Sequence, residues 1–203
     1  MIINDSFPKF DLPIDFIADD SITGDILNYY SNFPCKIKAG VFVLCTEGMV
    51  KATINLLEVV IRKNDFVIVL PNSFIQIHEV SSDTRISFAG FSSDFMLSGN
   101  YVEILLDSMP MILNSPVISL QDDIAGLYRN VYLLLIRAYT LPHSLENKDI
   151  IRSILAIFLQ GTKELYKRYG RKLDEPLRRE QELYRQFIQL LMAHYTSEHE
   201  VAF

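Results

Sequence analysis

Residues 50–56, VKATINL, alternate between apolar and polar side chains, and this alternation decides the fold class. Val50 and Ile54 fall on one face of an extended chain, whereas Lys51 and Thr53 fall on the other. Successive side chains of a strand point to opposite faces, so the pattern predicts a strand with one buried face. The surrounding part of the chain should therefore be built from β-sheet.

Short apolar runs flank this strand on both sides. Gly40–Thr46 is rich in β-branched and aromatic residues, and Phe66–Leu70 (FVIVL) is apolar throughout, as in a strand covered on both faces. Phe74–Val80 and Arg85–Phe91 follow as a strand pair around a polar turn, and we expect Val117–Leu120 to add a last strand. Short strands separated by polar turns at this spacing predict a sandwich or a barrel.

The turn between Ile54 and Val59 contains no glycine. Tight hairpins need a positive φ at one or both central residues. Asn55 is the only residue of this segment that adopts a positive φ readily. We therefore expect a hairpin here, with a register that the sequence leaves open.

The later part of the chain has helical periodicity. Residues 93–108 predict a short helix with Ser92 or Ser93 as its N-cap. Apolar residues then recur at intervals of three and four, which predicts two longer helices over 121–140 and 147–169.

These two helices carry more apolar surface than one sheet face is expected to cover. Exposed surface of that kind tends to mark an interface, and two-fold homodimers are the commonest assembly. We therefore predict that residues 121–172 form a helical dimerisation region. The alternative is that the same side chains pack only against each other and the sheet. The candidate interface residues are Val131, Leu135, Ile154, Leu155 and Phe158.

Charge and composition restrict the partners. Residues 1–120 hold 7 Lys and Arg against 14 Asp and Glu, whereas residues 121–203 hold 12 against 11. An acidic first part argues against DNA contact there, because DNA binding depends on cations that neutralise phosphates. No apolar run approaches the roughly 20 residues of a membrane span, and the start lacks a signal-peptide pattern. With only Cys35 and Cys45 present, we expect a cytoplasmic protein without a disulfide framework.

Catalytic motifs are missing from the sequence. It contains no GxSxG, no P-loop and no GxGxxG. The acidic pairs Asp19-Asp20 and Asp122-Asp123 are adjacent in sequence, and neither a strand nor a helix would aim such neighbours at one substrate. We therefore predict that the chain is not an enzyme.

The strand-rich part resembles metal-binding β-barrels of the cupin type in its frame but not in its ligands. Cupins place histidines and a glutamate on one strand and a further histidine after a later turn. Here Val41 and Gln76 occupy two of those positions, and Cys35 and Ile37 lie at the others. These residues do not form a hard-metal ligand set, so we expect no metal and no other cofactor. The resemblance implies an α+β chain with a double-stranded, jelly-roll type β-barrel followed by helices.

A small ligand could bind inside such a barrel, where a few polar groups such as Gln76 and His78 would lie among apolar walls. A lone histidine is, however, more often a hydrogen-bonded structural residue. Few hydrogen-bonding side chains are available, which favours an apolar or amphipathic ligand over a sugar. The candidate ligand-binding residues are Val43, Cys45, Phe74, Gln76 and His78.

A filled barrel without any ligand is the other interpretation, and it would make the chain an interaction module. Large side chains suffice to fill a small barrel. The candidates are Phe66, Ile68, Phe74 and Phe88.

Residues 187–203, FIQLLMAHYTSEHEVAF, resemble the opening of the DNA-binding domain of AraC-type transcription regulators. Leu190-Leu191 and His194-Tyr195 match the end of that domain's first helix, and a second helix would begin near Val201. The barrel, the two apolar helices and this tail also follow the family's order. The resemblance implies a sensing barrel over 1–120, a dimerisation region over 121–172, and a linker with the first helix of a truncated helix-turn-helix domain over 173–203.

The same resemblance implies a function. The chain would be the regulatory part of a bacterial AraC-type regulator, which senses a small-molecule effector and forms a homodimer. DNA would be contacted only through helix-turn-helix units beyond this sequence, so we expect no specific DNA binding by these 203 residues. The alternative is a metal-free cupin-fold enzyme or a small-molecule-binding protein.

Overall fold

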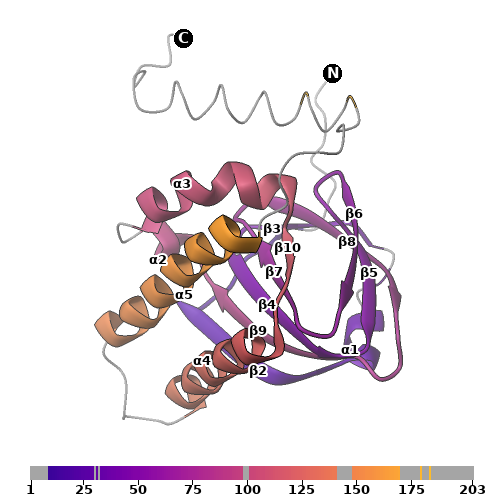
Figure 1. Ribbon diagram of the computed structural model, residues 1–203, viewed down its shortest axis with the longest axis horizontal. Helices are drawn as coiled ribbons and strands as arrows, with labels where there is room; N and C mark the ends of the chain where they lie inside the picture. The colour runs from indigo at the N-terminus through magenta and orange to yellow at the C-terminus, as the bar shows by residue number, and fades with distance from the viewer. Residues whose placement is uncertain are drawn as a thin grey trace.

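The computed structural model describes residues 9–29, 31, 33–97, 101–140, 148–169, 179 and 183. Two five-stranded sheets stack face to face, and helices cover the outer face of one of them (Figure 1). The strands are β1 (Lys9–Phe10), β2 (Phe16–Thr23), β3 (Cys35–Ile37), β4 (Gly40–Glu47), β5 (Met49–Ile54), β6 (Leu57–Arg62), β7 (Asp65–Val69), β8 (Ser73–Val80), β9 (Arg85–Phe91) and β10 (Val117–Ser119). The helices are α1 (Gly24–Tyr29), α2 (Ser93–Leu97), α3 (Tyr101–Asn114), α4 (Asp122–Thr140) and α5 (Lys148–Tyr169).

Sheet A has the strand order β1-β3-β8-β5-β6, and sheet B has the order β10-β7-β4-β9-β2. Neighbouring strands are antiparallel except for β1 and β3. The architecture is thus a cupin-like β-sandwich with added helices, which agrees with the predicted mixture of sheet and helix.

The predicted closed barrel is not formed. Among the described strands, no hydrogen-bonded ladder joins β6 of sheet A to β10 of sheet B. Strand β10 has only three residues, all of them paired with β7, and the chain enters α4 soon afterwards. Sheet B therefore ends at β10, and no ladder closes this side of the sandwich.

The space between the sheets is filled by aliphatic side chains. Buried residues of both sheets meet there, and Phe88 and Val43 pack against them. The buried residues of this inner core are Cys45, Val50, Ala52, Ile54, Ile61, Val67, Val69 and Ile86. The alternation is therefore confirmed over Val50–Ile54, because Val50, Ala52 and Ile54 face the other sheet, whereas Leu56 lies in the turn and is 54% exposed.

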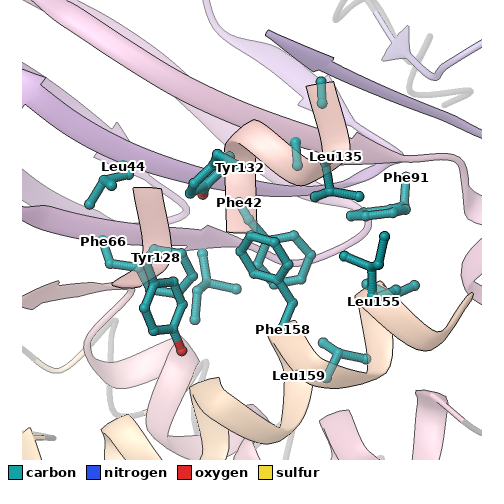
Figure 2. Packing of buried hydrophobic residues seen from close by; sticks show 14 of the residues in the cluster. Phe42, Leu44, Phe66, Phe91, Tyr128, Tyr132, Leu135, Leu155, Phe158 and Leu159 are labelled. Atoms are coloured by element: carbon teal, nitrogen blue, oxygen red, sulfur yellow. The ribbon is translucent and has the colours of Figure 1, made fainter. Parts of the chain in front are cut away.

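A second, aromatic core lies between sheet B and the helices (Figure 2). Phe158 of α5 sits at its centre, and its ring centroid lies 5.4 Å from that of Phe42 and 5.1 Å from that of Tyr132. Strand β7 contributes to both cores, because Phe66 faces the helices whereas Val67 faces sheet A. The prediction that FVIVL is covered on both faces is confirmed.

The β5–β6 hairpin has the backbone that the sequence suggested. Asn55 has a φ of 54°, and Ile54 pairs with Leu57 across a two-residue loop. The Asn55 carboxamide oxygen accepts a hydrogen bond from the Phe74 amide at 3.0 Å, which ties the turn to β8.

The helices follow the predictions with one difference. Ser92 is the N-cap of α2, since its hydroxyl accepts a hydrogen bond from the Phe95 amide at 3.2 Å. The helix predicted over 93–108 corresponds to α2 and to the first part of α3, which continues to Asn114; residues 98–100 lie outside the described residues. Helices α4 and α5 match the predicted ranges within a residue and share the aromatic core with sheet B, so the predicted boundary at residue 120 runs through one core.

Strands before Gly40 were not foreseen. Strand β2 forms an edge of sheet B by pairing with β9, and an irregularity between Asp19 and Ile22 interrupts its register. Asp19 there accepts hydrogen bonds from the amide and the hydroxyl of Ser21. This polar bend hides the strand from a search for alternation. The linker and tail features predicted over 173–203, including Leu190-Leu191 and His194-Tyr195, lie outside the described residues.

Candidate ligand-binding groove

The five residues predicted to bind a ligand lie on two sides of sheet A. Val43 and Cys45 face the inner core, whereas Phe74 and His78 of β8 are exposed on the outer face. Strand parity explains the division, because Ile75 and Ile77 occupy the inner side of β8 and leave Gln76 between them on the outside. The structure therefore does not bring these five residues together.

His78 has a structural explanation. Lys51 pairs with Glu79 and Ala52 with Ile77, so His78 is the additional residue of a β-bulge. Its Nε2 atom shares a hydrogen bond of 2.7 Å with the Thr53 hydroxyl. His78 is thus hydrogen-bonded, as the alternative interpretation held, but it is exposed and does not lie in the core.

The inner core is poorly suited to binding a polar ligand. Cys45 is fully buried, and burial together with the nearby Asp65 carboxylate raises the pKa of its thiol to about 11. Of the four residues considered as barrel fillers, Phe88 alone packs in the inner core. Phe66 and Ile68 face the helices, and Phe74 lies on the outer face of sheet A.

A groove of about 690 Å³ opens instead at the unclosed side of the sandwich, between β6 and β10. This volume falls within the usual range of small-ligand sites. The lining residues come from β6, from the start of β7, and from the connection between α3 and β10. They are Leu57, Glu58, Val59, Val60, Arg62, Lys63, Asp65, Asn114, Ser115, Pro116, Val117, Ile118 and Ser119.

Asp65 fixes the closed end of the groove. One carboxylate oxygen accepts a hydrogen bond from the Arg62 amide at 2.7 Å, and the other accepts one from the Ser119 hydroxyl at 2.6 Å. Asp65 is only 5% exposed, so these bonds hold β6 and β10 in a fixed relation at this end.

The other charged side chains of the groove differ from Asp65 in their exposure to solvent. Glu58, Arg62 and Lys63 are exposed, and none of them forms an ion pair within the described ranges. They are therefore available to a charged ligand.

Two hydrogen bonds connect the groove walls to the helices. The Asn64 side-chain amide, in the β6–β7 turn, donates to the Asp122 carboxylate at the start of α4 at 2.5 Å. The Tyr166 hydroxyl of α5 donates to the Ser115 carbonyl at 2.6 Å. Each wall is thus hydrogen-bonded to one of the two helices.

Sequence reasoning did not find this groove. Its walls come from residues 57–65 and 114–119, which are distant in the chain. The local signal available in the sequence was the Asn64-Asp65 turn.

Four of the five predicted interface residues are covered within a single chain. Leu135, Ile154, Leu155 and Phe158 are each 4% exposed or less, and three of them are labelled in the aromatic core of Figure 2. They therefore have almost no surface to offer a partner. Val131 is partly buried against the same core.

Other apolar residues of the same helices are exposed. On α4, Leu127 is 59% exposed and Leu134 is 47% exposed, and with Val131 they occupy one face at intervals of four and three residues. On α5, Ile150 and Ile157 are 37% and 60% exposed and lie two turns apart. We refer to these five residues as the exposed helix stripe.

Metal and membrane sites were searched as well. Within the described residues, no three or more His, Cys, Asp or Glu side chains gather as a metal site would require. None of the described helices is long and apolar enough to cross a membrane.

Solved structures similar to this chain include AraC-like regulators and a protein of ethanolamine utilization. CuxR, an AraC-like transcriptional activator, matches with 12% identity and a TM-score of 0.44, over 81% of this chain and 54% of CuxR. ToxT from Vibrio cholerae matches with 12% identity and a TM-score of 0.41, over 92% of this chain and 68% of ToxT. A Salmonella typhimurium protein assigned to ethanolamine utilization, EutQ, matches with 13% identity and a TM-score of 0.27, over 38% of this chain and 55% of EutQ.

The chain therefore spans little more than half the length of CuxR and of EutQ. No family model and no curated protein matches the sequence. Similarities at this level carry no functional argument.

Proposed function

We propose that this chain is the regulatory part of an AraC-type transcription regulator, which binds an effector in the groove between β6 and β10 and self-associates through α4 and α5. The observation that carries the proposal is the direct hydrogen bonding of both groove walls to these two helices. The resemblance of residues 187–203 to the start of an AraC-type DNA-binding domain gives the class.

The groove supplies the sensing step. A ligand shifts an equilibrium only by the difference in its affinity for the two states. The Asn64–Asp122 and Ser115–Tyr166 hydrogen bonds make the position of each wall depend on the position of one helix. A ligand that prefers one spacing of β6 and β10 would therefore favour one arrangement of α4 and α5.

The exposed helix stripe supplies the self-association step. Leu127, Val131 and Leu134 form a face on α4 that suits packing against another helix. Ile150 and Ile157 add exposed apolar surface on α5, which meets α4 where Gly161 approaches the Tyr128 hydroxyl. These residues take the place of the buried ones as the proposed dimer contact.

Sedimentation equilibrium at micromolar concentration tests this proposal. Leu134→Asp should weaken the dimer at least tenfold, because it places a charge in an apolar interface. Leu133→Asp is the matched control, since Leu133 is similarly exposed at 38% but points about 100° away around α4. A monomeric wild-type protein, or equal effects of the two substitutions, would contradict the proposed interface.

A small-molecule-binding protein without a regulatory role is the second candidate, because the groove alone would serve it. The two candidate functions differ in whether ligand binding is coupled to dimerisation. In a regulator, Asn64→Ala should alter how strongly a bound ligand changes the dimer dissociation constant, whereas a simple binding protein would show no such linkage.

A further inference from the structure

We infer that the groove binds a short extended peptide with free termini, which adds as a strand to the open edge of β6. The role of this site in sensing rests on the proposed function, whereas the peptide binding itself does not. The inference depends on the backbone of this edge and on the charges at the two ends of the groove.

Strand β6 presents unpaired backbone groups to the groove. Ile54 and Leu57 close the hairpin, and pairing alternates from there, so Leu57, Val59 and Ile61 direct their backbone groups toward β5. The backbone N–H and C=O groups of Glu58 and Val60 therefore point away from β5, where no described strand pairs with them.

Strand β10 forms the other wall of the groove. The Ile68 amide donates to the Pro116 carbonyl and the Leu120 amide donates to the Asn64 carbonyl, so these alternate residues face β7. The backbone amides of Val117 and Ser119 point to the other side, toward the groove. The Val117 carbonyl already accepts a hydrogen bond from the Ser115 hydroxyl at 3.1 Å. An extended chain in the groove could therefore form its strand hydrogen bonds with the edge of β6, which is the β-augmentation mode of peptide recognition.

The side-chain environment suits small apolar residues. Val59 and Val117 line the groove and also pack against the inner core. Alternate side chains of an added strand would point toward these valines, and the others would point to solvent.

Charge sets the length and direction of the peptide. Glu58 lies near one end of the β6 wall, and Arg62 and Lys63 lie at the other. Arg62 lies four positions after Glu58, which is about 13 Å along the strand at roughly 3.3 Å per residue. A peptide of about four residues would place its amino terminus near Glu58 and its carboxylate near the two cations, and would run parallel to β6.

Isothermal titration calorimetry with a tetrapeptide of alternating alanine and valine tests the inference. The peptide with free termini should bind, and the same peptide with an acetylated amino terminus and an amidated carboxyl terminus should bind at least tenfold more weakly. Arg62→Gln combined with Lys63→Gln should remove most of that difference.

Two substitutions of one residue test the backbone contact. Val60→Pro removes an N–H that faces the groove and leaves the ladder to β5 intact, as proline on an edge strand allows. It should weaken tetrapeptide binding at least tenfold. Val60→Ala keeps the N–H and should bind as the wild type does. Circular dichroism and thermal unfolding of both variants establish that they are folded.

Failure of the tetrapeptide to bind the wild type, or equal binding by Val60→Pro and Val60→Ala, would overturn the inference. Equal affinity for the free and the blocked peptide would overturn the assigned length and direction. Sedimentation remains a separate measurement. If the wild type is a dimer but does not bind the peptide, only the inference of peptide binding fails. If it binds the peptide but is strictly monomeric, only the proposed regulatory function fails.

Discussion

The hydroxyl groups of Tyr132 and Tyr166 lie in the same core but in opposite hydrogen-bonding situations. Tyr132 is fully buried, and no described residue reaches its hydroxyl, whereas the Tyr166 hydroxyl donates to the Ser115 carbonyl. Burial raises the pKa of both phenols above the ordinary value, so both stay neutral at physiological pH. Comparing the two residues therefore separates the free-energy cost of a buried hydroxyl without a hydrogen bond from the stabilisation by a buried hydroxyl that has one.

Replacing each tyrosine with phenylalanine should move stability in opposite directions. Tyr132→Phe removes a buried hydroxyl that lacks a partner and should raise the free energy of unfolding by about 1 kcal/mol. Tyr166→Phe leaves the Ser115 carbonyl without its donor and should lower the free energy of unfolding by about 1–2 kcal/mol. Urea unfolding measures both. A loss of stability in both variants would show that Tyr132 has a partner after all.

At the scale of elements, the β5–β6 hairpin positions one wall of the groove. Its turn depends on Asn55, which combines a positive φ with a hydrogen bond to the Phe74 amide of β8. The turn thus sets the path of β6 and anchors it to a neighbouring strand. Sequence reasoning identified Asn55 because few residues accept this backbone, but it could not see the contact with a residue 19 positions away.

Substitution of Asn55 should separate its two roles. Asn55→Gly keeps the positive φ at no steric cost and loses only the side-chain bond, so the free energy of unfolding should fall by about 1 kcal/mol. Asn55→Ala also introduces backbone strain and should lower it by about 2 kcal/mol. Chemical denaturation compares the two. An alanine variant as stable as the glycine variant would mean that φ is not constrained at this position.

At the scale of the whole molecule, two helices and a sheet meet where α5 crosses α4. A Cβ atom on Gly161 would lie 2.6 Å from the Tyr128 hydroxyl oxygen, so the glycine permits this close approach. Glycine within a helix costs about 1 kcal/mol relative to alanine. The packing of the two helices therefore explains a residue that the helix itself would disfavour.

A double-mutant cycle at this crossing tests the packing. Gly161→Ala should lower the free energy of unfolding, because Tyr128 is buried and has little freedom to move. In a Tyr128→Phe background the obstructing oxygen is gone, and the same change should be neutral or stabilising. The coupling free energy should be about 1 kcal/mol or more. Additive effects would show that the two residues do not meet.

Periodicity along the chain predicted most of the strands and helices, because it depends only on residues that are neighbours in sequence. The sequence also predicted the inward residues of β5, the double burial of β7, the turn at Asn55, the cap at Ser92 and the extents of α4 and α5. It failed at β2, where a polar bend interrupts the alternation.

Which side chains are buried by other elements could be seen only in the tertiary structure. A bulge at His78 and the parity of β8 divided the predicted ligand residues between two faces of sheet A. The aromatic core buried Leu135 and Phe158 and left Leu134 and Ile157 exposed, although all four belong to the same apolar helices. The groove lies where β10 ends sheet B and where the outer edge of β6 has no hydrogen-bonded partner among the described strands. Burial and open edges depend on contacts between distant segments, and periodicity along the chain carries no information about those contacts.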